Sequence, residues 1–455
     1  MLINFSVSNF RSFYKSQTFS MKAGKVRNFA NHTLRVANTK LLKFKAVYGS
    51  NASGKTNLVK AIDFMRSSVV YGINNASISD YCRLNVENAN QPSRFEIDII
   101  LAEVHYTYGF EVLLSESRFT KEWLFVEKSN KRQLVFSRDI EKEEYNVESY
   151  CNDAALNKRL GIYADDIKAD SSILFLYSMN QNKDSLYAAD SKIKVYQILY
   201  RWFKYKLIVN YPDDHITQYT YFFDSQGSVA AEELLRRFDT GISKVNICDE
   251  PAEKVMSQFP PQFAQNILDN LNEQKIRNNK SGKNEPPAVV IRNFQRTEMY
   301  LIQMNGEEII CKTLKFNHNH SNSLFALKDE SDGTRRLLDL IEILLLDVDD
   351  VVYVIDEINR CLHPLITKQF VKDFLEISHQ RNIQLIATTH ETDLMDLGLL
   401  RQDEIGFIEK RDTDGASIIF GLEDYGARFD KKIRTAYMKG EYKAVPKIQD
   451  IQQML

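Results

Sequence analysis

The sequence predicts an α/β protein with a mixed sheet at its core, and three stretches of the chain support that fold class. The apolar run at 41–47 leads into a glycine-rich turn and then an amphipathic helix. Two more short apolar runs, at 351–355 and 383–387, end in polar residues. Buried parallel strands have this form, because their C-terminal ends deliver polar residues to one edge of the sheet.

The first stretch, VYGSNASGKTNL at 47–58, matches the phosphate-binding pattern G-x-x-x-x-G-K-[ST] at every fixed position. Glycines let the backbone curl, so that successive N–H groups and the start of the following helix face an anion. Lys55 then reaches the β- and γ-phosphates, and the Thr56 hydroxyl ligates Mg²⁺. The chain is therefore predicted to bind a nucleoside triphosphate together with Mg²⁺. The predicted nucleotide-binding residues of the loop are Gly49, Ser50, Asn51, Ala52, Ser53, Gly54, Lys55, Thr56 and Asn57.

The second and third stretches supply the remaining predicted chemistry. Asp356 is expected to hold Mg²⁺, and Glu357 to polarise the attacking water. His390 is expected to sense the γ-phosphate or to help orient that water. Acids at a strand tip and a lone histidine are often only structural, but a phosphate loop in the same chain favours the functional interpretation. Lys55, Glu357 and His390 are thus the predicted catalytic residues.

A further anion site is predicted upstream of the acidic strand. Ser331, in the stretch ESDGTRR, can cap a helix whose free N–H groups and positive dipole end attract an anion. The chain therefore carries two helix starts that favour phosphate.

The remaining pattern predicts an antiparallel sheet joined to the nucleotide core. Strands are expected at 2–10, 95–101, 106–114, 123–126, 133–136 and 173–177, with a loop or hairpin at 28–39. From 191 to about 274 the apolar residues recur with the period of a helix. A polar loop is expected at 276–287, and strands resume at 289–291, 299–304 and 307–310. We therefore predict three parts: 1–190, the first half of the core with its antiparallel sheet; 191–287, a mainly helical insertion; and 288–455, the second half. No heptad run is present, which excludes a long coiled coil.

Composition limits the classes of function. Apolar residues make up 44% and charged residues 26% of the 455 residues, as in an ordinary globular protein. The 59 Lys and Arg are balanced by 61 Asp and Glu, so no overall basic field collects nucleic acid. Five widely spaced cysteines without a C-x-x-C pair favour reduced thiols over disulfides or zinc. Acidic residues interrupt the most apolar stretch, 337–355, and no signal peptide is apparent, so a soluble, cytoplasmic protein is expected.

Together these motifs resemble the ABC-type ATPase heads of structural-maintenance-of-chromosomes and recombination-repair proteins. The motifs are GSNASGKT, ESDGTRR, VVYVIDEIN with the following LHP, and ATTH. More narrowly, they resemble the bacterial abortive-infection ATPases: the AbiL/RloA type, the ATPase component of the PARIS defence system and the ATPase half of OLD nucleases. The stretches NFRSF, LLRRFDTGI and YMKGEYKAVPKI extend this resemblance over most of the chain.

The resemblance implies further site residues. Ser331 and Gly333 are implied to complete the ATP site of a neighbouring protomer, with His390 as the switch histidine. Arg11 is implied to contact phosphate, and Gln181 to be a glutamine-loop ligand of Mg²⁺. Asp332 stands where the commoner signature has its first glycine, which leaves the closure geometry of that anion site open.

The resemblance also suggests a biological role. The leading hypothesis is an anti-phage ATPase whose heads form homo-oligomers, which responds to a phage-derived trigger and controls a separate effector such as a TOPRIM nuclease or a toxin. The stretch after His390 is too short for the TOPRIM domain that OLD proteins carry there, and this favours a separate effector. A weaker hypothesis is that the protein is a scaffold that binds ATP with negligible turnover.

The alternative from another class is a DNA-binding ATPase of repair or chromosome maintenance. Such a protein needs a basic surface. The candidate basic residues are Arg201, Lys204, Lys206, Lys431, Lys432, Arg434, Lys439 and Lys443. Clusters of this kind are usually solvated helix faces.

Three further histidines have structural interpretations. His318 and His320 lie one residue apart, and on a strand their side chains would point to opposite faces, which does not suit a single metal ion. His363, before Pro364, is expected to pack or to form a hydrogen bond at the interface between heads.

Overall fold

The computed structural model describes residues 1–73, 77–128, 131–147, 150, 153–183, 186–187, 191–212, 214, 220–281, 286–293, 298–425 and 432–446. The chain forms two compact, discontinuous units. The first combines Met1–Pro212, Val348–Ile358 and Leu375–Leu455, and the second combines Asp213–Asp347 and Asn359–Phe374. The predicted divisions at 190 and 287 do not coincide with these limits.

A mixed six-stranded sheet in the first unit carries the three predicted apolar strands. Its order is β11-β17-β18-β5-β19-β20, and all neighbours are parallel except β19 and β20. The strands are β5 (Phe44–Tyr48), β11 (Leu207–Asn210), β17 (Val351–Ile355), β18 (Ile383–Thr388), β19 (Ile405–Lys410) and β20 (Ser417–Gly421). The C-terminal ends of the five parallel strands therefore meet at one edge, which the sequence predicts for β5, β17 and β18 but not for β11 and β19.

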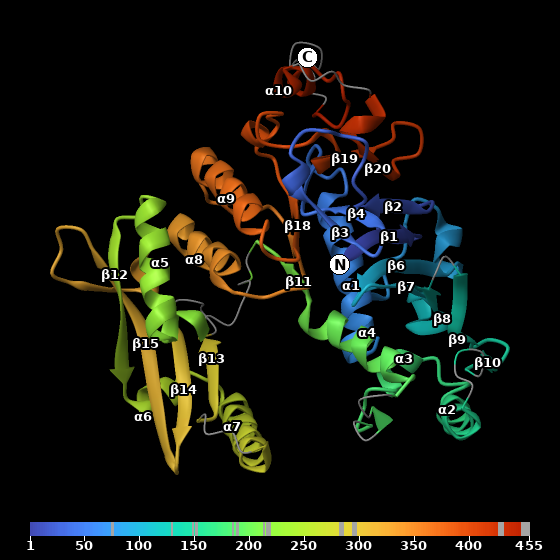
Figure 1. Ribbon diagram of the computed structural model, residues 1–455, viewed down its shortest axis with the longest axis horizontal. Coiled ribbons are helices and arrows are strands. Elements are labelled where there is room, and N and C mark those ends of the chain that lie inside the picture. Colours follow the sequence, from blue (N-terminus) through green and yellow to red (C-terminus); the bar gives the residue numbers. More distant parts are fainter. Residues whose placement is uncertain are drawn as a thin grey trace. The chain divides into compact units, whose positions relative to one another are not determined.

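An antiparallel seven-stranded sheet, in the order β10-β9-β8-β7-β6-β1-β2, forms the other main layer of this unit (Figure 1). Its strands are β1 (Leu2–Ser8), β2 (Gln17–Ser20), β6 (Ser93–Leu101), β7 (Val104–Leu113), β8 (Arg118–Lys128), β9 (Lys131–Asp139) and β10 (Glu144–Asn146). A separate hairpin joins β3 (Thr33–Val36) to β4 (Thr39–Leu42), which confirms the hairpin expected near 28–39.

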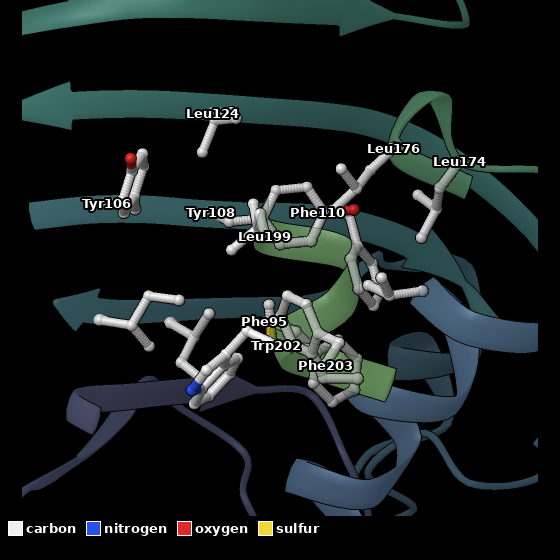
Figure 2. Packing of buried hydrophobic residues seen from close by; sticks show 14 of the residues in the cluster. Phe95, Tyr106, Tyr108, Phe110, Leu124, Leu174, Leu176, Leu199, Trp202 and Phe203 are labelled. Carbon is white, nitrogen blue, oxygen red and sulfur yellow. The ribbon is translucent and has the colours of Figure 1, made fainter. Parts of the chain in front are cut away.

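Helix α1 joins the two sheets of the first unit. Phe64 on α1 contacts Phe95 of the antiparallel sheet at 4.9 Å between ring centroids, and the same buried core includes Val352 of the central sheet. Figure 2 shows helix α4 placing Phe203 against Tyr108, whose ring centroids lie 5.7 Å apart. The helices are α1 (Lys55–Tyr71), α2 (Ala154–Asp166), α3 (Phe175–Ser178), α4 (Lys194–Tyr205) and α10 (Ile433–Met438).

The second unit has an antiparallel sheet in the order β12-β15-β14-β13, with β16 also paired to β15. Its strands are β12 (Ile242–Glu250), β13 (Ala288–Arg292), β14 (Met299–Asn305), β15 (Glu308–His318) and β16 (Leu324–Ala326). The helices α5 (Ser225–Arg237), α6 (Ala252–Met256), α7 (Pro261–Ser281) and α8 (Asp332–Leu345) belong to this unit, and α9 (Pro364–Ile377) begins in it. Leu271 on α7 and Ile302 on β14 share its small buried core.

Short 3₁₀ helices complete the described elements. They are η1 (Ala30–His32), η3 (Val86–Asn90), η4 (Leu114–Glu116), η6 (Thr220–Phe223), η7 (Leu327–Asp329), η8 (Thr392–Leu394), η9 (Gln402–Glu404) and η10 (Leu422–Tyr425).

The structure corrects three local predictions. The strand expected at 173–177 is helix α3, because the Glu122 carboxylate accepts hydrogen bonds from the N–H groups of Phe175 and Leu176 and so satisfies a helix start. The loop expected at 276–287 begins later, since α7 continues to Ser281. The apolar run at 41–47 is two strands, β4 and β5, which are separated at Lys43.

The stretch 191–287 also contains two strands that the sequence does not predict. It contains α4, α5, α6 and α7, but β11 pairs with β17 in the central sheet and β12 forms an edge of the second unit's sheet. Among the described helices the longest, α7, has 21 residues, and none forms a long coiled coil. No helix in the described part of the chain is long and apolar enough to cross a membrane.

Candidate functional site

The loop between β5 and α1 needs glycine at both fixed positions of its pattern. A Cβ atom on Gly49 would lie 2.4 Å from the carbonyl oxygen of Ile408. Gly54 has φ +117°, and a Cβ atom there would lie 2.4 Å from Oγ of Ser417. Gly54 is also the N-cap of α1, so no side chain caps the first N–H groups of the helix. These groups are therefore left to bind an anion.

Two serines hold this loop from distant parts of the chain. Ser417, at the start of β20, donates a hydrogen bond from Oγ to the carbonyl oxygen of Ser53 at 2.5 Å. Its N–H group donates to the carbonyl oxygen of Ser12 at 2.8 Å, and Asn57 Nδ2 donates to Ser12 Oγ at 2.8 Å. Sequence reasoning missed both supporting serines, because nothing local to either residue marks it as a neighbour of the loop.

A cavity of about 580 Å³ opens over the loop. Besides residues 51–57 of the loop and helix start, it is lined by Glu357, His390 and Lys410. These three side chains come from the C-terminal ends of β17, β18 and β19, which lie at the same sheet edge. The structure thus brings the three predicted catalytic residues Lys55, Glu357 and His390 to one cavity. Lys410 was missed, since its place follows only from the pairing of β19 with β5.

Lys55 is buried at the base of the cavity. Its Nζ donates hydrogen bonds to the carbonyl oxygens of Gly49 at 2.9 Å and Ser50 at 3.1 Å. Burial lowers the pKa of the Lys55 ammonium to about 8, against the opposing effect of the Asp356 and Glu357 carboxylates. The Lys55 ammonium therefore lies in the cavity that a phosphate would enter, and its present partners are two backbone carbonyl oxygens.

The two acids after β17 have different environments. Asp356 is 2% exposed, and its Oδ1 accepts a hydrogen bond from Thr388 Oγ1 at 2.5 Å. Glu357 has a left-handed φ of 48°, and its N–H group donates to the same Thr388 Oγ1 at 2.8 Å. Glu357 lines the cavity, whereas Asp356 lies behind it in the protein interior.

His390 follows β18 at the same edge. Burial, and then the nearby Lys55 ammonium, lower the pKa of His390, against the opposing carboxylates of Glu357 and Asp356. The imidazole is therefore neutral at pH 7 and can donate or accept a hydrogen bond. The preceding residue, Thr389, donates its N–H group to the carbonyl oxygen of Val47 at 3.1 Å, which ties the histidine to the strand before the loop.

The donor set suits a magnesium ion. Thr56 lines the cavity, and Asp356 lies behind Glu357 at the end of β17. Hydroxyl and carboxylate oxygens are the hard ligands that Mg²⁺ takes when it is also bound to phosphates. We therefore retain Thr56 and Asp356 as the residues that would hold it.

Two residues implied by the resemblance lie elsewhere in the first unit. Arg11 pairs with Asp80 at 2.9 Å and has a left-handed φ of 50°. Gln181 follows α3, and its Nε2 donates to the carbonyl oxygen of Tyr177 at 3.5 Å. Neither lines the cavity over the loop, so their contacts with phosphate and Mg²⁺ stay predictions.

The predicted second anion site begins α8 in the second unit. Ser331 is its N-cap and accepts a hydrogen bond from the N–H group of Thr334 at 3.0 Å, which confirms the predicted cap. A Cβ atom on Gly333 would lie 2.6 Å from the carbonyl oxygen of Cys361, so this position requires glycine. Participation of Ser331 and Gly333 in a neighbour's site stays a prediction.

The candidate basic surface is partly committed to other contacts. Arg434 pairs with Asp393, and Lys206 Nζ donates to the carbonyl oxygen of Asp349 at 2.8 Å. Lys431 lies outside the described residues.

His318 pairs with Glu330 at 2.8 Å, and His363 Nδ1 accepts from the N–H group of Leu365 at 3.2 Å.

The strand, glycine-rich loop and helix, with two acids and a histidine at the neighbouring strand ends, define a P-loop ATPase domain of the α/β class. The sequence profile of one family, described as "AAA domain, putative AbiEii toxin, Type IV TA system", matches residues 44–396. The match covers more than half of the chain, so the chain belongs to this family. No curated protein matches the sequence.

Solved structures similar to this chain include three head domains. One is an SmcHead bound to the C-winged helix domain of ScpA, 13% identical over 93% of this chain and 99% of that chain, with a TM-score of 0.40. Another is the SMC head domain from Thermotoga maritima, 11% identical over 92% and 98%, with a TM-score of 0.34. The third is an Smc head domain with an extended coiled coil bound to the C-terminal domain of ScpA derived from Pyrococcus furiosus. It is 14% identical over 97% and 99%, with a TM-score of 0.34.

Proposed function

We propose that this protein hydrolyses ATP and that its heads associate around the bound nucleotide. The observation that carries the proposal is the cavity in which Lys55, Glu357 and His390 meet over the phosphate loop. A phosphoryl-transfer site needs a cation and free N–H groups for the phosphates, and a carboxylate for the attacking water. The cavity provides all of these.

Each residue has a defined part in the proposed reaction. Lys55 and the N–H groups of the loop and α1 bind the β- and γ-phosphates and stabilise their charge. Glu357 orients a water molecule in line with the γ-phosphate and accepts its proton. Neutral His390 hydrogen-bonds the γ-phosphate or this water. Mg²⁺, when bound, supplies further neutralisation of the phosphate charge.

The test compares the wild type with Glu357→Gln at equal concentration. We expect the variant to bind ATP with nearly unchanged affinity and to lose turnover by roughly 100- to 1000-fold, as for other losses of a transition-state group. Light scattering should show a mass increase on addition of ATP and Mg²⁺ that persists in Glu357→Gln and decays in the wild type. Equal phosphate release by both proteins would contradict the proposal.

We further propose that the ATPase acts in anti-phage defence and controls a separate effector, a nuclease or a toxin. The family description and the motif resemblance to AbiL/RloA, PARIS and OLD ATPases support this role. The purified chain should therefore leave DNA and RNA intact with or without ATP. Cleavage by the chain alone, unaffected by Glu357→Gln, would contradict an effector supplied by another protein.

A further inference from the structure

We infer that Thr388 is a positioning residue for ATP hydrolysis, and that its hydroxyl group sets the geometry between the two acids. The inference rests on the proposed hydrolysis and concerns the residue at the end of β18. The hydroxyl lies 2.5 Å from Asp356 Oδ1 and 2.8 Å from the Glu357 backbone nitrogen. One side-chain oxygen thus contacts both residues of the acidic pair.

The direction of both hydrogen bonds of the Thr388 hydroxyl follows from the groups that it contacts. A carboxylate accepts hydrogen bonds and cannot donate them, so the Thr388 hydroxyl donates to Asp356. Its lone pair then accepts from the N–H group of Glu357. A hydroxyl has one donor and can fill both contacts, and a methyl group can fill neither.

The second contact supports an unusual backbone conformation. Glu357 has φ 48°, a left-handed value that costs energy for a residue with a Cβ atom. The hydrogen bond from its N–H group to Thr388 fixes this conformation, in which the Glu357 side chain lines the cavity. The carbonyl oxygen of Thr388 also accepts from the N–H group of Ile358 at 3.0 Å. Thr388 therefore contacts three consecutive residues at the end of β17.

The sheet register puts Thr388 in this position. Ile355, the last residue of β17, pairs with Ala387 of β18, so Asp356, which follows β17, lies beside Thr388, the last residue of β18. On its other side Thr388 pairs with Val47, two residues before the first glycine of the loop. Thr388 is fully buried between the loop strand and the acidic strand, so its contacts are held by the sheet.

This geometry assigns two effects to the hydroxyl. It donates a hydrogen bond to one oxygen of Asp356 and so fixes the orientation of the carboxylate. The other carboxylate oxygen is then oriented to bind Mg²⁺, or a water molecule of the Mg²⁺ ion. The hydroxyl also holds Glu357 in the conformation in which its side chain lines the cavity. Loss of the hydroxyl should therefore slow the reaction while leaving the phosphate loop, and hence ATP binding, in place.

The experiment compares Thr388→Val, which keeps the shape and loses the hydroxyl, with Thr388→Ser, which keeps the hydroxyl. We expect Thr388→Val to lower kcat by about 10- to 100-fold, the usual effect of losing a group that orients a metal ligand. We expect its affinity for a fluorescent ATP analogue to change less than about 3-fold, and Thr388→Ser to retain kcat within about 3-fold. The Mg²⁺ concentration for half-maximal rate should rise in Thr388→Val alone.

Thr120→Val is the matched control. Thr120 lies on β8, is buried, and its hydroxyl has no hydrogen-bond partner among the described residues. The control should retain the wild-type kcat. A folded Thr388→Val variant with the wild-type kcat would overturn the inference. An equal loss of kcat in Thr388→Ser and Thr388→Val would also overturn it. If Thr388→Val does not fold, the kcat of Thr388→Ser decides. A wild type without Glu357-dependent turnover would refute the proposed function, and the inference with it.

Discussion

Ser417 donates a hydrogen bond from Oγ to the carbonyl oxygen of Ser53 at 2.5 Å, and this bond joins the start of β20 to the phosphate loop. The two residues are separated by 364 positions in the chain. Because the Ser417 hydroxyl also lies against Gly54, it fixes the loop just before α1 begins. The shape of the loop therefore depends on a contact that is remote in sequence.

Replacement of Ser417 by alanine should loosen the loop and weaken nucleotide binding. A buried hydrogen bond contributes about 1 kcal/mol, so we expect the Kd for ATP to rise by roughly 5-fold in Ser417→Ala. The kcat at saturating ATP should change little, since the reacting groups are untouched. Titration with a fluorescent ATP analogue measures the effect. Ser16→Ala, at an exposed serine directly before β2, is the control, and equal affinity in both variants would count against support by Ser417.

The site shows which kinds of residue a sequence can reveal. The phosphate loop, the acidic strand end and the Ser331 cap each lie within one short segment, so local spacing and periodicity were enough to find them. Ser417 and Lys410 come to the site through the order of strands in the central sheet, and Ser12 comes to it from the turn between β1 and β2. That order depends on pairings between distant segments, which no local pattern encodes.

Helix α3 shows the same limit for secondary structure. Its apolar residues suit a strand as well as a helix, and the choice is made by Glu122, whose carboxylate accepts from the N–H groups of Phe175 and Leu176. Burial raises the pKa of Glu122, which these N–H groups oppose. A partner 53 residues away thus decides the local structure.

The affinity for ATP should depend on the protonation of Lys55. Burial lowers the pKa of its ammonium to about 8, and a phosphate binds the protonated form. At pH values above about 8 the free protein must take up a proton on binding, so the affinity should fall as pH rises, by at most about 10-fold per pH unit. Binding measured between about pH 7 and 9.5 checks this prediction. Lys55→Arg stays charged throughout, so its affinity should not fall over this range. Parallel profiles would contradict the assignment to Lys55.

A buried acid on α8 should make the stability of the protein depend on pH. Burial raises the pKa of Glu342 from 4.5 to about 8, although Arg292 opposes this shift. Between about pH 5 and 8 the Glu342 carboxyl is protonated in the folded state and ionised in the unfolded state. The free energy of unfolding therefore falls as pH rises through this range. Glu342→Gln cannot ionise, so the variant should keep its stability at alkaline pH.

Thermal unfolding measures this effect. At about pH 8.5 we expect Glu342→Gln to unfold roughly 2–4 °C above the wild type, which corresponds to about 1 kcal/mol, and the difference should vanish near pH 5. The control is Glu273→Gln on α7, whose side chain is 69% exposed and should show no such difference. A wild-type melting temperature that is flat from pH 5 to 9 would refute the prediction.

The proposed association of heads can be tested by mixing two inactive variants. If Ser331 and Gly333 of one protomer complete the site over Lys55 of another, Lys55→Ala removes the loop side of a site and Ser331→Arg removes the helix side. A mixed dimer then contains one site with both sides intact and one with both sides damaged. We expect an equimolar mixture to recover up to about a quarter of the wild-type rate, because half of the dimers are mixed and each has one of two sites restored.

The matched control mixes Lys55→Ala with Glu357→Gln. Both substitutions damage the same side of the site, so no arrangement of the two chains restores an intact pair, and the mixture should stay inactive. Recovery in both mixtures would show that complementation does not depend on the α8 side. Recovery in neither, with all three variants folded, would mean that Ser331 acts within its own chain, where its hydroxyl caps α8 through the N–H group of Thr334. Loss of that cap would then lower stability by about 1 kcal/mol without any link to a neighbouring protomer.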